Sequence, residues 1–406
     1  MATIDDLLLG GRPASGGGAD YGAAIAYGLR APSRIGRSDE IDGWIVESAE
    51  GKSTIVARSP QALGRKETIE AGTERIQRYL DLLAFERFDV SELSKVGDNH
   101  VVLYADGADR ILEIAATDDL VLGVSVSGVV YDRDGNSRPT SPGPPAVWTP
   151  ALRFYRLSQA SRDLYEAYRN LWLGLEALLS TISPKQPGEG ERKWLRRVLT
   201  EIAGRVDLTP LMPEAGRDPV DYMLTDQYHR MRCHLFHAKP EGGMEAPTIP
   251  DPEAVAVAYA QLIRIWRDIA HHLIGVRQGG IGVVTYEGFR MMLFNAFSPG
   301  VDVVYSDAPV SAKTTDTAIN PGGAARIVLE GARYQDGVLP GLVSVSGSLP
   351  TADRPLPKLQ RFGCEIDGTL FSAGAIEGGV ELSGIDRLDI VQVFRLKNAS
   401  SPRVSF

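Results

Sequence analysis

The chain has few cysteines and no long apolar run, and each absence excludes a class of protein. Only Cys233 and Cys364 occur among 406 residues, and neither belongs to a Cys-x-x-Cys pair. A disulfide framework and a zinc ribbon are therefore excluded. The first residues lack the basic start and apolar core of a signal peptide, and no apolar run is long enough to cross a bilayer. We expect a cytoplasmic protein with no membrane partner.

The sequence motifs of several common enzyme classes are also missing. There is no Gly-x-Ser-x-Gly elbow, no His-Glu-x-x-His pair and no dinucleotide fingerprint. The glycine-rich stretch 10–18 is not followed by Gly-Lys-Ser/Thr, which excludes a P-loop. The segment from Asp132 to Asn136 resembles half of a calcium loop but lacks the downstream glutamate, so we expect a turn there. The sequence predicts neither a cofactor nor a bound metal.

The composition is that of a folded protein with an uneven charge. Apolar residues make up 43% and charged residues 23% of the chain, which is typical of globular domains, and the length suggests two or three of them. The net charge of −9 argues against non-specific coating of nucleic acid. Residues 151–277 contain 17 Lys and Arg against 16 Asp and Glu, so this third is near +1 and the remainder near −10. A local nucleic-acid site would fit best there.

Hydrophobic patterning divides the chain into three parts. Residues 1–149 contain short β-branched runs, such as 121–127, interrupted by one amphipathic helix predicted over 68–88. A proline-rich linker follows at 138–145. Residues 150–277 read as helical, with helices expected over four ranges: Leu152 to Ile182, Glu191 to Arg205, Pro219 to His237 and Pro252 to Val276. Helices joined by loops make a bundle the default architecture.

Residues 278–406 return to strand patterns, and they echo the first part. Val101 to Gly128 contains three short motifs that recur in the same order between Val303 and Gly347. We interpret this echo as a duplicated β unit, with chance similarity among Val/Ser strands as the alternative. The predicted fold class is therefore α+β multidomain: a central bundle of four to five helices flanked by two β-rich domains.

A cluster of histidine and arginine is the strongest candidate for chemistry. Five of the six histidines lie between positions 229 and 272. The third predicted helix carries Arg230, Arg232, His234 and His237. A metal-free ribonuclease needs a base, an acid and a cation that stabilises the charged phosphorane, and His and Arg supply these roles.

The spacing of this cluster is similar to that of a known family. A helical bundle with Arg, four residues and then His resembles the HEPN superfamily, and Arg232 to His237 has that spacing. The stretch Tyr168 to Leu179, with Glu176 inside an apolar run, is similar to the first helix of Apea-like members. The resemblance covers roughly residues 150–277 and leaves both flanks unexplained.

The resemblance implies a homodimer that cuts RNA without metal and leaves a cyclic phosphate. Arg232 would hold the scissile phosphate, His237 would be the acid/base, and Glu176 would orient one of them. The family usually has a small polar residue after the arginine, where this chain has Cys233. His234 is a substitute, and Arg230 offers a second register. By analogy of architecture, the protein resembles prokaryotic defence or toxin-type effectors.

Two other interpretations of the cluster remain open. His229, Cys233 and His237 are metal-ligand types at helical spacing, but on consecutive turns they span about 12 Å and cannot all reach one ion. In the other interpretation the protein is a non-catalytic binding protein: the helices form a homodimer or higher homo-oligomer, and the flanks carry the function. In the nuclease interpretation, the acidic flanks would recognise a protein or small-molecule trigger, or hold the bundle inactive until a trigger arrives.

Overall fold

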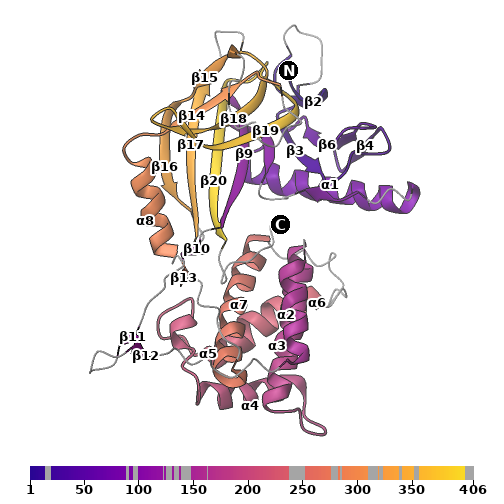
Figure 1. The fold of residues 1–406 in the computed structure, drawn as a ribbon. Helices are drawn as coiled ribbons and strands as arrows, with labels where there is room; N and C mark the ends of the chain where they lie inside the picture. Colours follow the sequence, from indigo (N-terminus) through magenta and orange to yellow (C-terminus); the bar gives the residue numbers. More distant parts are fainter. Residues whose placement is uncertain are drawn as a thin grey trace. The chain divides into compact units, whose positions relative to one another are not determined.

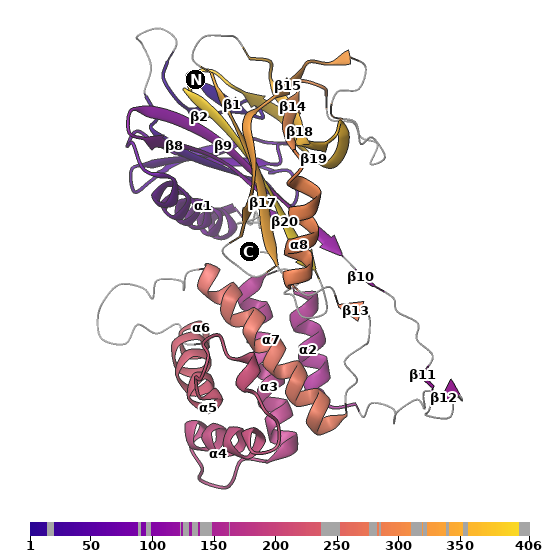
Figure 2. The same ribbon diagram turned by 90° about the vertical axis from the view of Figure 1, so that its left-hand side faces the viewer.

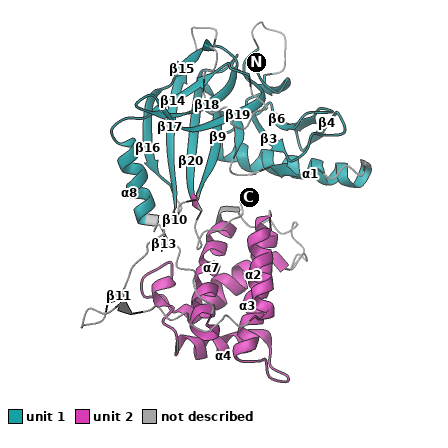
Figure 3. Cartoon of the chain, viewed as in Figure 1, with its two compact units in different colours: residues 1–120, 286–395 teal, residues 121–285, 396–406 magenta. Residues whose placement is uncertain are grey.

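The computed structural model in Figure 1 describes most of the chain. The described residues are 1–13, 20–87, 91–94, 99–121, 123–124, 130–131, 137–138, 148–161, 163–236, 252–275, 282–283, 286–309, 319, 323–337, 341–351 and 356–397. They fall into two compact units (Figure 3). Unit 1 combines Met1–Leu120 with Tyr286–Arg395, and unit 2 combines Val121–Thr285 with Leu396–Phe406.

The larger sheet of unit 1 has ten strands drawn from both ends of the chain. Its strand order is β16-β17-β20-β9-β8-β3-β6-β5-β4, with β7 beside β3. Strand β20 therefore joins the N-terminal strands at β9, and buried residues alternate along β17 as in a half-covered sheet. The strands are β3 (Ala23–Leu29), β4 (Arg37–Ile41), β5 (Trp44–Ser48), β6 (Thr54–Ser59), β7 (Leu93–Ser94), β8 (His100–Asp106), β9 (Asp109–Val121), β16 (Glu330–Asp336), β17 (Leu342–Pro350) and β20 (Arg387–Lys397).

The second sheet of unit 1 has six strands and mixes the chain ends in the same way. Its order is β15-β14-β18-β19-β1-β2, so β1 pairs antiparallel with β19. The β18–β19 hairpin turns at Asp367-Gly368, both with positive φ, a conformation that glycine adopts without strain. The strands are β1 (Ala2–Ile4), β2 (Leu7–Gly10), β14 (Asp302–Ser306), β15 (Arg326–Val328), β18 (Leu359–Ile366) and β19 (Thr369–Glu381).

Two helices pack against the sheets of unit 1. Helix α1 (Arg65–Arg87) contacts β3, β6 and β8 and buries Ile76, Tyr79 and Leu83. Helix α8 (Tyr286–Phe297) lies beside β16 and β17 (Figure 2) and buries Phe289, Leu293 and Phe297. Both helices present apolar side chains at helical spacing to a sheet, which removes those side chains from water.

Unit 2 holds the remaining helices. Tyr168 and Trp172 of α3 are buried in the same core as Tyr259 and Trp266 of α7. No described helix of either unit is long and apolar enough to cross a membrane. The elements are α2 (Pro150–Ala160), α3 (Leu164–Ile182), α4 (Glu191–Ala203), the 3₁₀ turn η1 (Thr209–Leu211), α5 (Pro219–Tyr222), the π-helix η2 (Met223–Arg232), α6 (Cys233–Phe236), α7 (Pro252–Ile274) and four short strands, β10 (Gly123–Val124), β11 (Val130–Tyr131), β12 (Ser137–Arg138) and β13 (Gly282–Val283).

The predicted fold class is wrong. The β-rich flanks are not two domains around a central bundle of four to five helices, because strands from both flanks share the two large sheets of ten and six strands. The described helices are spread over both units and range from four-residue α5 and α6 to 23-residue α1 and α7. Hydrophobic periodicity reports which residues form a strand, but it does not report which distant strand will pair with it.

The two segments read as a duplication occupy different places. Strand β8 pairs with β3 and β9 in the ten-stranded sheet, whereas its proposed counterpart β14 pairs with β15 and β18 in the six-stranded one. The second motif, 107–113, begins the 13-residue strand β9, whereas its counterpart, 323–330, contains the three-residue strand β15 and only the first residue of β16. The first copy's third motif, 124–128, lies largely outside the described residues. Helix α8, by contrast, lies where only strands were expected.

Candidate active site

The predicted third helix is not a regular α-helix. Its first turn is α5, the ten residues from Met223 to Arg232 form a π-helix, and α6 follows. The amide of Cys233 donates to the carbonyl of Tyr228, five residues back rather than four. A regular helix would place Arg230 and His237 near one face, but the turns up to Arg232 are wider than those of an α-helix, and His237 lies outside the described residues. Short π-helical segments occur frequently at functional sites.

Gln227 fixes the π-helix to its neighbours. This side chain is fully buried, and its amide nitrogen donates to the hydroxyl of Tyr222 and to the backbone carbonyl of Ala258, both at 3.0 Å. Its amide oxygen accepts from the hydroxyl of Tyr168 at 2.9 Å. A buried amide with all these bonds made holds its backbone in one place. The end of the π-helix, which carries Arg232, is therefore positioned by α3, α5 and α7.

The structure brings Arg232 and Glu176 together, as the sequence predicted for a shared site. Nη2 of Arg232 lies 3.6 Å from Oε1 of Glu176 in α3. The same nitrogen donates to Oε1 of Glu191, the first residue of α4, at 2.9 Å. The Arg232 side chain is only 14% exposed, and its guanidinium also lies over the rings of Tyr228 and Phe236. One cation thus meets two carboxyl groups in a largely desolvated place.

The surroundings of Glu176 favour its protonated form. Burial is the largest cause that raises the pKa of Glu176 above its usual 4.5, and the neighbouring carboxyl of Glu191 raises it further. A hydrogen bond of 2.6 Å from the indole nitrogen of Trp172 and the charge of Arg232 act in the opposite direction but have less effect. A carboxyl group with a raised pKa, beside an arginine, is suited to proton transfer at a charged substrate.

The other predicted site residues are placed less favourably. Arg230 is 76% exposed and pairs with Asp226 at 3.2 Å, one turn back along the same segment. His234 is exposed on α6. His237, the predicted acid/base, lies outside the described residues. Of the predicted set, therefore, the structure brings Arg232 and Glu176 together, and Arg230 and His234 do not lie with them.

Two residues that contact this segment, Glu191 and Arg169, were not predicted from the sequence. Glu191 follows Gly190 at the start of a helix, where an acidic residue is common because it faces the positive end of the helix dipole. Nothing in the sequence distinguishes that role from an ion pair with Arg232. Arg169 of α3 donates through Nε and Nη2 to the carbonyl of Leu235, at 2.9 and 2.6 Å. This bond anchors the segment two residues before His237.

The described residues lend no support to a metal site. They contain no group of three or more His, Cys, Asp or Glu side chains that could hold an ion. His229 is exposed and Cys233 half-buried, while Cys364 belongs to β18 of unit 1.

Comparison with protein families, curated proteins and solved structures finds no match to the chain.

Proposed function

We propose that unit 2 is a metal-independent endoribonuclease that uses Arg232, Glu176 and His237. The observation that carries the proposal is the 3.6 Å approach of the Arg232 guanidinium to the Glu176 carboxyl in a largely buried place. Arginine is suited to phosphate because its fork of N–H donors matches phosphate oxygens. The raised pKa of Glu176 favours its neutral form, so an incoming phosphate would have to displace chiefly the ion pair of Arg232 with Glu191.

The proposed reaction is an internal transfer at phosphorus. The ribose 2′-oxygen attacks the adjacent phosphorus and loses its proton to a base, while the bond from phosphorus to the 5′-oxygen breaks and that oxygen takes a proton. The products are a 2′,3′-cyclic phosphate and a 5′-hydroxyl. Arg232 would stabilise the charged phosphorane, His237 would exchange the protons, and Glu176 would hold the arginine or the histidine in position.

The proposal extends to assembly and cellular role. We propose that the active form is a homodimer or higher homo-oligomer, for which the exposed side chains of Leu157 in α2 and Val257 in α7 are candidate contacts. Unit 1 would bind a protein or small-molecule trigger that controls cleavage. The biological role would be that of a defence or toxin-like effector in the cytoplasm, where free thiols such as Cys233 stay reduced.

A cleavage assay on mixed cellular RNA in excess EDTA tests the proposal. Wild-type protein should leave cyclic-phosphate ends, and Arg232→Ala, His237→Ala and Glu176→Gln should lose most of the activity while the fold is kept. Arg230→Ala is the matched control, because this arginine lies on the same segment, is exposed and is expected to leave cleavage unchanged. Cleavage that survives Arg232→Ala, or products without cyclic phosphate, would contradict the proposal.

A non-catalytic binding protein is the second candidate, and one observation favours it. Arg232 is already engaged by Glu191 and by two aromatic rings, as a structural arginine would be. In that case Arg232→Ala should lower the free energy of unfolding and leave RNA intact in every sample, wild type included. Sedimentation of wild type and variant would then show whether the helices mediate assembly.

A further inference from the structure

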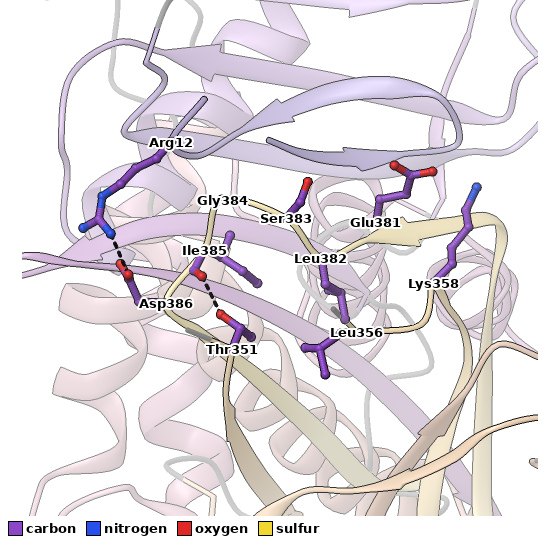
Figure 4. A pocket seen from close by; sticks show the side chains of 10 residues that line it. All are labelled: Arg12, Thr351, Leu356, Lys358, Glu381, Leu382, Ser383, Gly384, Ile385 and Asp386. Carbon is purple, nitrogen blue, oxygen red and sulfur yellow. Dashed lines mark hydrogen bonds and ion pairs between the residues drawn. The ribbon is translucent and has the colours of Figure 1, made fainter. Parts of the chain in front are cut away.

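Unit 1 contains a cavity that the proposed ribonuclease does not use. Its volume is about 620 Å³, within the usual size of small-molecule sites. The described residues that line it come from the N-terminal segment, from the residue after β17, from the stretch just before β18, and from the end of β19 and the chain that leads to β20. Figure 4 shows charged side chains at both ends of the cavity and the apolar side chains of Leu356, Leu382 and Ile385 between them.

The charges at one end of the cavity neutralise each other. Nη1 of Arg12 donates to Oδ1 of Asp386 at 2.6 Å, and Nη2 donates to the carbonyl of Ala108 at 2.7 Å. The other carboxylate oxygen of Asp386 accepts from the amide of Arg110 at 2.7 Å. Both charged groups are therefore held by the protein itself, and this end acts as a fixed wall.

The charged side chains at the other end of the cavity are Lys358 and Glu381, and they do not form an ion pair with each other. Lys358 directly precedes β18 and Glu381 is the last residue of β19, so each is next to the register pair Leu359 and Val380. Figure 4 shows both side chains at the same end of the cavity. Within the described part of the chain, neither side chain makes a hydrogen bond or ion pair. Lys358 acts only at longer range on Asp6, whose carboxylate is bonded to Lys52 at 3.0 Å.

Two glycines with positive φ, Gly379 and Gly384, lie against the segments that line the cavity. Gly379 has a φ of +71°, and a Cβ there would lie 2.8 Å from Cε of Lys358. Gly384 has a φ of +72°, and a Cβ there would lie 2.3 Å from the carbonyl oxygen of Arg12. Any other residue at these positions would be strained and would displace the two chain segments that form the cavity wall.

We propose that this cavity binds a free α-amino acid with a large apolar side chain. The ammonium and carboxylate of such a molecule are adjacent, as Glu381 and Lys358 are, and its net charge is zero, as is that of this pair. The apolar side chain would extend over Leu356, Leu382 and Ile385. A ligand with one charge only would pair with either Lys358 or Glu381 but not with both, and would therefore bind more weakly.

The test is calorimetric titration of the full chain with L-phenylalanine, L-leucine and two blocked analogues. Phenylalaninamide lacks the carboxylate, and N-acetylphenylalanine lacks the ammonium. Wild type should bind phenylalanine saturably and each analogue about tenfold more weakly. Lys358→Gln should abolish the preference over phenylalaninamide only, and Glu381→Gln the preference over N-acetylphenylalanine only. Because each variant is compared with itself on two ligands, a general loss of stability does not imitate this crossed pattern.

The matched controls are Lys66→Gln and Glu70→Gln, an exposed Lys/Glu pair on α1 of the same unit. Both should keep the wild-type preferences. The proposal is overturned if neither amino acid binds at millimolar concentration, or if the Lys358 and Glu381 variants discriminate the analogues as wild type does. The ribonuclease proposal is unaffected by either result, because its assay reads unit 2.

Discussion

The indole Nε1 of Trp172 donates a 2.6 Å hydrogen bond to Oε1 of Glu176, four residues further along α3. That same oxygen is the one that lies 3.6 Å from Nη2 of Arg232. One carboxylate oxygen thus receives a neutral donor from its own helix and a cation from the end of the π-helix. The protonation of Glu176 therefore affects both contacts.

Glu176 should make the protein less stable as pH rises. Its pKa is raised in the folded state, chiefly by burial, so just above pH 4.5 the folded chain binds more protons than the unfolded chain. The stabilisation from protonated Glu176 is complete below pH 4.5 and is lost as the pH rises through the folded pKa. Glu176→Gln cannot titrate and should gain stability relative to wild type over this window. Urea unfolding between about pH 4 and pH 8 measures the difference, with exposed Glu201→Gln as control. Equal pH slopes for Glu176→Gln and wild type would rule the effect out.

Glu113 in β9 should show the opposite pH dependence. Burial raises the pKa of Glu113, but His100 and the hydrogen-bonded Arg65 outweigh it and lower that pKa to about 2. The stabilisation that the charged Glu113 provides is complete above pH 4.5, and it is lost as the pH falls from 4.5 through about 2. This pKa shift corresponds to a contribution on the order of 3 kcal/mol to the free energy of unfolding. Glu113→Gln should lose that contribution near neutral pH.

Chemical denaturation of the Glu113→Gln variant near neutral and at acid pH checks this prediction. The variant should lie well below wild type near pH 7 and approach it toward about pH 2, because protonation removes the same charge from wild type. Glu70→Gln, on an exposed face of α1, serves as the control and should cost little. A constant difference between Glu113→Gln and wild type at all pH values would indicate a packing effect instead.

Gln227→Leu should loosen the π-helix. The variant keeps much of the volume but leaves the carbonyl of Ala258 and the hydroxyl of Tyr222 without a donor from Gln227. We expect a loss of about 2 kcal/mol in the free energy of unfolding, because buried polar groups lose partners. Amide hydrogen exchange should rise first in Met223–Arg232. Uniform exchange, with no local increase there, would show that Gln227 does not anchor the segment.

The two cysteines should differ in reactivity. Burial is the main cause that raises the pKa of Cys364 to about 12, so this thiol carries almost no thiolate at neutral pH. Cys233 is half-buried and accessible to a small reagent. Under native conditions a disulfide reagent should modify one thiol per chain, and Cys233→Ser should abolish that fast phase. Fast modification of two thiols would show that β18 opens.

Local features of the fold could be predicted from the sequence better than its long-range pairing. The periodicity at Thr68 to Phe88 and the proline at 252 correspond to α1 and α7. No sequence pattern predicts that β1 pairs with β19 or that β9 pairs with β20. Strand pairing is set by complementary surfaces rather than by local pattern. The predicted fold class therefore separated strands that share two sheets.

The candidate site was predictable in part for the same reason. Spacing suggested Arg232, and the family resemblance suggested Glu176; the two residues belong to different helices and lie 3.6 Å apart. The π-helical register was invisible, since nothing in Met223 to Arg232 distinguishes it from an ordinary helix by composition. Glu191 was missed because an acidic residue at a helix start is expected without any further role.

The shared sheets set an order for folding during synthesis. When the ribosome has completed β9, that strand still lacks β20, which is made more than 260 residues later. Unit 2, apart from its short C-terminal piece, is complete by residue 285. Its core can therefore form while the first strands of unit 1 still lack their C-terminal partner strands. Such distant pairing folds slowly and leaves strand edges exposed in the meantime. Truncated chains that end before β19 should therefore aggregate rather than accumulate as a folded N-terminal domain.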